Sequence, residues 1–408
     1  MTFSSQSYRS HDPAEETHLP HGIAAQLTDR LLPQLQTGRL HLVLPDGRTI
    51  VRRGAQAGPE ATLTIRRWRA LWRIFLDGED GFSAGYIDGD WTTPDLASVL
   101  ELGMCNEAAL TPDTKRWLLS LMRNRIFHAL RANTKRGSRR NITAHYDLGN
   151  DFFRPWLDAG MNYSSALYAG AETLEQAQQR KLDRIAELLA LSGGERVLEI
   201  GCGWGALAER LVHGFGATVC GITLSSEQLA YAKERLSGDI GSGCADFRLV
   251  DYRDVDGRFD RIASVEMIEA VGERYWPTYF GKIRDCLASG GIALIQAITI
   301  NESRFAEYRK RPDFIQRHIF PGGMLPTPAI IEREAVRANL KLVQRQSFGE
   351  SYAQTLREWR IRFMRAAPKL DATRFGERFR RMWEYYLIYC EIGFRCGAID
   401  VGFYKLLG

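Results

Sequence analysis

The stretch VLEIGCGWGA, residues Val197–Ala206, decides the expected fold of this 408-residue chain. An apolar strand ends there in three closely spaced glycines, Gly201, Gly203 and Gly205, and a helical pattern begins directly after them. Glycine permits a tight turn and lets a ligand lie against the backbone. Further strand patterns alternate with helical ones and cover residues 217–224, 246–251, 259–267 and 292–300. This alternation predicts an α/β fold with a doubly wound parallel sheet.

The spacing of the glycines indicates the kind of ligand. Dinucleotide-binding loops read G-x-G-x-x-G and hold a pyrophosphate at a helix N-terminus, whereas this loop reads G-x-G-x-G with Glu199 two residues before it. That pattern is typical of S-adenosylmethionine-dependent methyltransferases, whose cofactor is cationic and carries no phosphate. A carboxylate beside the turn suits such a cofactor. A tight turn without any ligand is the alternative interpretation.

The ends of the next two strands should complete the cofactor site. Thr223 and Gln228 can bond the ribose hydroxyls, Asp251 can accept from the adenine amino group, and Tyr252 can stack on the ring. Helix capping is the alternative role for Asp251, and it is the role we predict for Ser225.

The segments on either side of this region suggest two domains. Downstream we predict helical insertions and two more strands, with helices over 326–339, 353–365 and 375–392 and strands over 342–348 and 401–407. Upstream we predict strands over 39–44 and 61–65, a helix or buried strand over 68–75, turns over 78–91 and a helix over 94–104. The predicted division is a mobile segment 1–25, a smaller mixed α/β N-terminal domain 26–125, and a Rossmann-like catalytic domain 126–408 with helical insertions.

Composition narrows the class of protein. Hydrophobic residues make up 45% and charged residues 25%, which excludes a disordered, collagen-like or disulfide-scaffold chain. Seven scattered cysteines contain no CxxC pair, so we predict no metal site and a reducing, cytoplasmic location. The sequence lacks both a signal peptide and an apolar run of the ~18–20 residues that a spanning helix needs.

Basic residues gather in one segment. Residues Thr114–Arg140 contain nine lysines and arginines and no acid, with apolar residues at helical spacing over 114–131. Such a segment is suited to contact with anionic lipids. A solvated helix face and a nucleic-acid patch are the alternatives.

Several motifs together resemble the cyclopropane fatty acid synthases. They are HYDLGNDFF (145–153), MNYSS (161–165), the glycine turn, SVEMIEAVG (264–272), IFPGG (319–323), FGESY (348–352) and CEIGFR (390–395). The resemblance implies transfer of a methyl carbon from S-adenosylmethionine to the double bond of a phospholipid acyl chain. It also completes the predicted cofactor-binding set, which is Tyr163, Ser164, Glu199, Gly201, Cys202, Gly203, Gly205, Thr223, Gln228, Asp251 and Tyr252.

The same resemblance implies the catalytic residues. The resemblance implies that a bound bicarbonate is the base that removes a proton after methylation. The matching residues here are Ser165, Glu269, Gln296, Ile298 through its backbone, and Tyr352, while Cys390 matches a family cysteine and is otherwise a small core residue. Aromatic faces can stabilise the cationic intermediate, and the candidates are Tyr163, Phe314, Phe320 and Tyr352. Glu266, three residues before Glu269, is interpreted as structural.

Three positions depart from the family pattern. Ser165 stands where a cysteine is typical, and Gln296 and Ala270 stand where histidines are typical. Serine and glutamine can still donate to an anion, but the product stays open between a cyclopropane ring and a methyl or methylene branch. A subgroup of the family that methylates oleoyl chains to such branched acids is equally similar.

The resulting hypothesis is a cytoplasmic, peripherally membrane-associated C-methyltransferase of unsaturated phospholipid. Its predicted cofactors are S-adenosylmethionine and bicarbonate, and its N-terminal domain is a candidate for homodimer contacts. No nucleic acid is expected, because the [DNS]-P-P-[YFW] motif of base-methylating enzymes is absent after the fourth strand. The alternatives are a methyltransferase of a small soluble substrate or RNA, and a lipid- or nucleic-acid-binding protein without activity.

Overall fold

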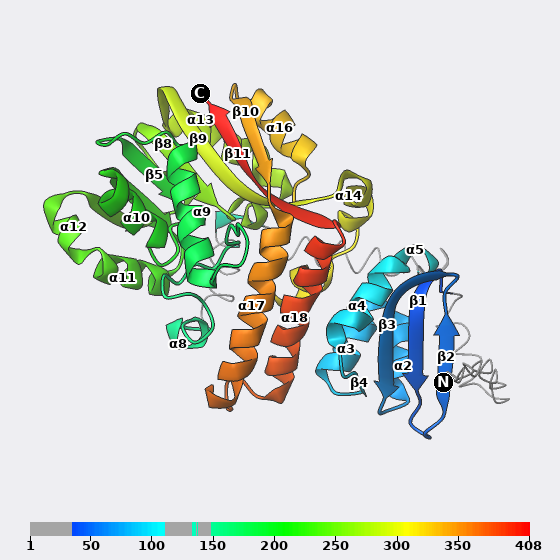
Figure 1. Ribbon diagram of the computed structural model, residues 1–408. Coiled ribbons are helices and arrows are strands. Elements are labelled where there is room, and N and C mark those ends of the chain that lie inside the picture. The colour runs from blue at the N-terminus through cyan, green and yellow to red at the C-terminus, as the bar shows by residue number, and fades with distance from the viewer. Residues whose placement is uncertain (1–34, 111–132, 136, 138–147) are drawn as a thin grey trace, which may run out of the picture.

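The computed structural model describes residues 35–110, 133–135, 137 and 148–408 (Figure 1). Its largest part is built on a seven-stranded sheet, whose strands are β5 (Arg196–Ile200), β6 (Thr218–Thr223), β7 (Ala245–Leu249), β8 (Phe259–Val265), β9 (Leu287–Ile300), β10 (Lys341–Ser347) and β11 (Ile399–Leu407). The strand order is β10-β11-β9-β8-β5-β6-β7. Strands β5 to β9 are parallel, and β11 runs antiparallel between β9 and β10.

Helices cover both faces of this sheet. The helices of this part are α8 (Asn150–Phe153), α9 (Leu174–Leu188), α10 (Ala206–Phe215), α11 (Ser226–Arg235), α12 (Ser237–Ser242), α13 (Trp276–Cys286), α14 (Glu302–Tyr308), α15 (Phe314–His318), α16 (Pro328–Arg337), α17 (Gly349–Ala366) and α18 (Glu377–Arg395), with short 3-10 turns η2 (Tyr252–Asp254), η3 (Ile268–Ala270), η4 (Glu273–Tyr275) and η5 (Ala367–Lys369). Successive residues of β5 point to opposite faces. Val197 packs in one core with α9 and α10, and Leu198 packs in the other with α13 and α16. The predicted doubly wound architecture is therefore confirmed.

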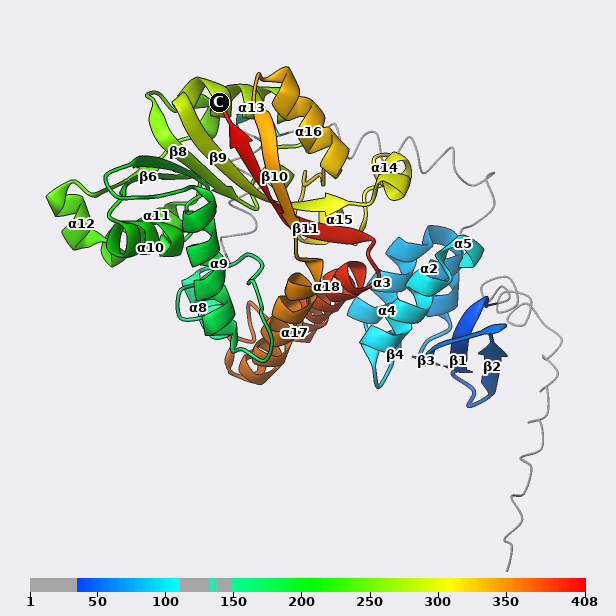
Figure 2. The same cartoon turned by 45° about the horizontal axis from the view of Figure 1, so that its top comes forward.

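The predicted helical insertions are α17 and α18. The two helices lie side by side and extend from the sheet past α8 in both views (Figures 1 and 2). Both are amphipathic, and residues such as Trp359 and Trp383 are buried between them and the rest of the catalytic part.

A smaller mixed α/β unit precedes the large sheet, as predicted. Its elements are β1 (Thr37–Val43), β2 (Thr49–Arg53), β3 (Gln56–Ile65), α2 (Arg69–Asp77), α3 (Glu79–Ile87), β4 (Trp91–Thr92), α4 (Leu96–Cys105) and α5 (Glu107–Leu110), and its sheet order is β2-β1-β3-β4. The unit packs on α18 (Figure 2). The Tyr86 hydroxyl donates to Glu384 at 2.8 Å, and the Arg381 guanidinium lies over the Tyr86 ring.

One expectation for this unit is wrong. Residues 78–91 contain the helix α3 and are not a run of turns. Their glycines serve close packing: a Cβ on Gly81 would lie 2.0 Å from the Arg73 carbonyl oxygen on α2, and one on Gly85 would lie 2.8 Å from the Trp91 ring. Closely spaced glycines therefore do not always indicate a turn, because a helix also contains glycine where a neighbouring element packs too closely for a Cβ atom.

Some predictions concern residues that the structure does not describe. The segment 1–25, the domain boundary at 125/126 and most of the basic segment 114–140 lie outside the described ranges. Within those ranges, no helix is long and apolar enough to cross a membrane.

Candidate active site

The glycine turn is held in a conformation that suits glycine. Gly203 and Gly205 have φ of +51° and +84°, where L side chains are strained. A Cβ on Gly205 would lie 3.1 Å from Ala232 on α11, so this glycine allows helix packing. A Cβ on Gly203 would meet nothing within 4 Å, and Gly203 lines a pocket. Its open side is therefore available to a ligand.

That pocket, of about 170 Å³, is where the predicted cofactor residues meet. Nine of the eleven line it, namely Tyr163, Ser164, Glu199, Gly201, Cys202, Gly203, Thr223, Gln228 and Tyr252. Gly205 and Asp251 do not. Asp251 caps η2 and pairs with Arg253, whose Nε lies 2.7 Å from its carboxylate. Its role at an adenine stays a prediction, whereas Ser225 caps α11 as expected.

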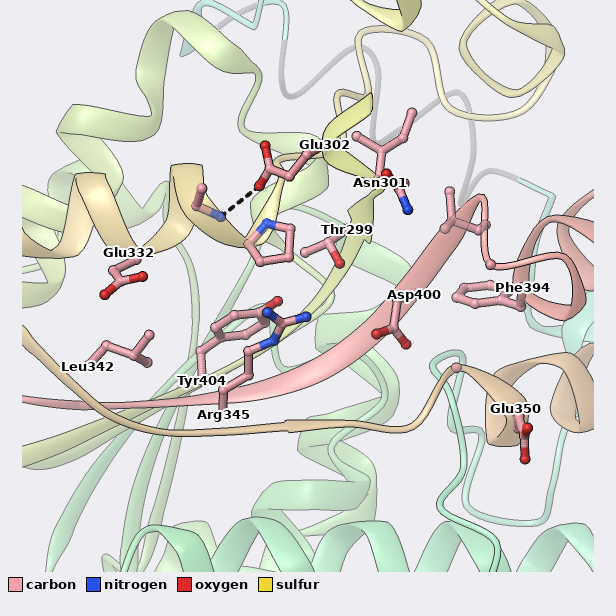
Figure 3. A pocket seen from close by; sticks show the side chains of 16 residues that line it. Thr299, Asn301, Glu302, Glu332, Leu342, Arg345, Glu350, Phe394, Asp400 and Tyr404 are labelled. Carbon is pink, nitrogen blue, oxygen red and sulfur yellow. Dashed lines mark hydrogen bonds between the residues drawn. The ribbon is translucent and has the colours of Figure 1, made fainter. Parts of the chain in front are cut away.

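A larger cavity of about 620 Å³ lies elsewhere, between the ends of β9 and β11 and the start of α16 (Figure 3). Carboxylates of Glu302, Glu332, Glu350 and Asp400 line it together with Arg345. It contains none of the predicted site residues. The smaller pocket is therefore the candidate cofactor site, because nine of the predicted cofactor residues line it.

Two buried charged groups set the electrostatics of the smaller pocket. Burial raises the pKa of Glu199 to about 8, and its Oε2 has no hydrogen-bond partner among the described residues. Burial also lowers the pKa of Lys181 to about 8, and its Nζ donates to the Ser164 hydroxyl at 2.9 Å. A buried carboxylate oxygen without a donor fits a cationic ligand. Sequence analysis missed Lys181, because no pattern marks one lysine on a helix as inward-facing.

Beside the cofactor pocket, four polar residues form one hydrogen-bonded group, which we call the Glu266 cluster: Ser165, Glu266, Gln296 and Tyr352. The Glu266 carboxylate accepts from the Ser165 backbone N at 2.8 Å and from Gln296 Nε2 at 2.7 Å. Its other oxygen accepts from the Tyr352 hydroxyl at 2.7 Å. Glu266 also lines the pocket. Sequence analysis interpreted Glu266 as structural, although its position three residues before Glu269 offered a signal.

The remaining predicted catalytic residues, Glu269, Ile298 and Cys390, do not line the pocket. Glu269 Oε1 accepts from the Ile298 backbone N at 2.5 Å, and its Oε2 has no partner within the described ranges. Burial, together with the charge of Glu266, raises the pKa of Glu269 to about 8. Burial raises the pKa of the Cys390 thiol, which favours the unreactive protonated form. The predicted catalytic residues therefore fall into two groups. Ser165, Gln296 and Tyr352 donate to Glu266, and Ile298 donates to Glu269.

Aromatic rings surround the pocket side of this cluster. Tyr163 lines the pocket, and its hydroxyl lies 2.9 Å from that of Tyr386. The Tyr163 ring centroid is 5.3 Å from that of Trp359 and 6.4 Å from that of Phe320. Phe314 instead packs on Tyr385, at 4.7 Å, away from the pocket-lining set. Three of the four predicted aromatic residues are therefore near the site.

The parallel sheet, the left-handed glycine turn and the buried carboxylate of Glu199 define an S-adenosylmethionine-dependent methyltransferase. Residues 133–403 match the family described as mycolic acid cyclopropane synthetase. The chain belongs to this family, which makes it a methyltransferase of the cyclopropane synthase kind that acts on lipid acyl chains.

Individual relatives agree with this assignment. The chain is 39% identical to tuberculostearic acid methyltransferase UfaA1 of Mycobacterium tuberculosis, over 93% of this chain and 90% of the relative. It is 37% identical to the cyclopropane-fatty-acyl-phospholipid synthase of Escherichia coli, over 81% and 83% of the two chains. The crystal structure of mycolic acid cyclopropane synthase CmaA1 complexed with SAH and CTAB superposes with a TM-score of 0.62 at 29% identity, covering 66% of this chain and 98% of that one.

Proposed function

We propose that this protein methylates the double bond of unsaturated acyl chains carried by membrane phospholipids. The observation that carries the proposal is the position of the Glu266 cluster, which meets the cofactor pocket beside the ring of Tyr163. Two similar proteins are named for tuberculostearic acid methylation and for cyclopropane formation on fatty acyl phospholipid. Both names fit an acyl double bond as the methyl acceptor.

The chain's own residues support each requirement of this reaction. When bound, the cofactor supplies a methyl group that bonds to one alkene carbon, leaving a positive charge on the chain and S-adenosylhomocysteine as the other product. The Tyr163 face can stabilise that charge. Glu199 is suited to the cationic end of the cofactor, and we propose that Glu269 holds the Ile298 backbone beside the site. The partly buried Cys390, whose thiol is held in the protonated form by a raised pKa, takes no part in covalent chemistry.

Incubation with labelled cofactor and separate pools of phospholipid, tRNA and DNA tests the proposal. We expect label in unsaturated phospholipid and none in the saturated phospholipid control. Proton NMR of the product then separates ring methylene protons, far upfield, from exocyclic methylene protons in the olefinic region. Label in tRNA, or in small soluble molecules only, would contradict the proposed substrate.

Membrane contact by the described residues is proposed at one face of α2. Trp68, Trp72 and Leu76 recur every fourth residue and are 38%, 45% and 68% exposed. Exposed Arg66 flanks them, which complements anionic headgroups, whereas Arg69 is paired with Asp90 at 2.7 Å. We propose an anionic phospholipid bilayer as the partner of this face.

Vesicle sedimentation tests this contact. Trp72→Ser with Leu76→Ser should weaken binding to anionic vesicles by about tenfold, because exposed apolar side chains that enter a bilayer contribute roughly 1–2 kcal/mol. The matched control is Val336→Ser with Met364→Ser, two other exposed apolar side chains. If both double variants bind the vesicles equally well, α2 is not part of the membrane-binding surface. Sedimentation velocity of the full chain tests the proposed homodimer separately.

A further inference from the structure

We propose that Glu266 is the built-in proton acceptor of this enzyme and that it takes the place of a bound bicarbonate. The inference rests on the proposed function, since it assigns the proton-removal step of that same reaction. The site residues do not fit a separate anion, because the carboxylate of this chain already occupies the donors that would bind one.

The first argument is the geometry of the donors. Two side chains expected to hold an anion, Gln296 and Tyr352, donate to Glu266 at 2.7 Å, and the Ser165 backbone N donates to it at 2.8 Å. The Ser165 hydroxyl donates elsewhere, to the Ala166 carbonyl at 2.9 Å. A carboxylate and a bicarbonate present the same pair of acceptor oxygens to such donors. One anion therefore fills this site, and it belongs to the chain.

The second argument is the backbone of Glu266. Its φ is +49°, a left-handed conformation that is strained for a residue other than glycine. Its amide N donates to the Gln296 carbonyl at 2.8 Å, which fixes this conformation at the end of β8. Backbone strain of this kind persists only where surrounding contacts hold the residue in place, and such residues are concentrated at functional sites. Here it turns the carboxylate toward the pocket and Tyr352.

The third argument is chemical. Glu266 is half-buried and lines the pocket, whereas Glu269 does not line it. Burial raises the pKa of Glu266, and the hydrogen bonds from Tyr352, Ser165 and Gln296 oppose that rise. A carboxylate with a raised pKa is a stronger base than one in water.

The proposed step is balanced within the reaction. Glu266 takes a proton either from the newly added methyl group or from a chain carbon next to the positive charge. In the first case the electron pair of the methyl C–H bond bonds to the cationic carbon and closes a ring. In the second case the electron pair forms a double bond, and in both cases the charge on the chain disappears. Glu266 becomes a neutral carboxylic acid and releases its proton to water after the product leaves. No other reactant is needed.

Glu266→Gly provides the test, because the positive φ suits glycine and the relief of backbone strain opposes the cost of the three donors left without an acceptor. We expect wild-type turnover to be unchanged in bicarbonate-free buffer. The variant should lose about a hundredfold in turnover, or ~2.7 kcal/mol at ~1.36 kcal/mol per decade, while calorimetry shows unchanged cofactor affinity. Added formate or bicarbonate should raise the turnover of the variant about tenfold, because either anion can accept the hydrogen bonds that Glu266 accepts in the wild type. Loss of most wild-type turnover without bicarbonate, or near-normal turnover of the variant, would overturn the proposal.

A binding readout keeps this test separate from the substrate question. NMR titration with 13C-bicarbonate should show saturable binding to Glu266→Gly and none to the wild type, whichever lipid is methylated. Glu266→Gly with Gln296→Leu is the matched control, and it should weaken that binding. Saturable binding to the wild type that Gln296→Leu abolishes would show a separate anion site and overturn the proposal. If phospholipid is not methylated but these binding results hold, only the substrate assignment fails.

Discussion

The glycine turn and the Glu266 cluster border the same pocket but are built in different ways. The turn comes from ten consecutive residues, Val197–Ala206, whose conformation is largely local. The Glu266 cluster joins residues from four parts of the chain: Ser165 lies 101 residues from Glu266, Tyr352 lies 86 away and Gln296 lies 30 away. A binding loop can therefore be inferred from sequence, whereas the hydrogen-bond partners of the half-buried Glu266 carboxylate depend on how distant segments pack.

The largest expected effect concerns the turn. Gly203→Val should lower cofactor affinity by more than about a hundredfold, because the new side chain enters the pocket, a loss of ~2.7 kcal/mol. Calorimetry measures this. Gly243→Val is the matched control, since Gly243 also has positive φ and open surroundings but caps α12 outside the pocket-lining set. Both variants should lose similar stability. Equal cofactor affinity in the two would mean that the turn is structural only.

The next effect concerns the cluster. Tyr352→Phe removes a hydrogen bond that lowers the pKa of Glu266. The pKa of Glu266 should rise, so the acidic limb of the rate profile should move to higher pH, and turnover should fall about tenfold, as expected for the loss of one hydrogen bond to a charged group. Lys181 and Glu269 also face this carboxylate and remain in the variant. A lower rate with an unshifted profile would make Tyr352 a packing residue.

A smaller effect is the pH dependence of cofactor binding. Below pH 8 Glu199 is mostly protonated, and a cationic ligand favours its carboxylate. Affinity should therefore rise with pH and level off above 8, by at most about tenfold per pH unit. Lys181 loses its charge in the same range and adds to the rise. Calorimetry of Glu199→Gln should show weaker binding and a shallower slope, and an unchanged slope would exclude Glu199 from the linkage.

The smallest effect separates the two glutamates. Glu269 is mostly protonated at neutral pH, because its pKa is raised to about 8, and glutamine imitates that form. Glu269→Gln should therefore lose less than about fivefold in turnover at pH 7, or roughly 1 kcal/mol. Turnover measured from pH 6 to 9 checks this. A hundredfold loss at neutral pH would place Glu269 in the chemistry, as the family resemblance implies, and would weaken the contrast with Glu266.

Local sequence patterns were enough to predict the sheet, the glycine turn and most residues of the candidate cofactor pocket. Alternating strand and helix patterns locate β5 to β9, and nine of eleven predicted cofactor residues line one pocket. These features follow from local rules, namely hydrophobic period and the freedom of glycine, and parallel strands bring their carboxyl ends to one edge.

Only the tertiary structure decided which glutamate meets the pocket and what the glycines of α3 are for. Glu266 and Glu269 are equivalent in type and three residues apart, but the left-handed backbone at Glu266 directs only its carboxylate to Tyr352, Gln296 and Ser165. Two glycines of α3 likewise serve close contacts, Gly81 with α2 and Gly85 with the Trp91 ring, which no local pattern contains. Burial and hydrogen bonding depend on segments far apart in the chain, and these set the charge and the direction of a side chain.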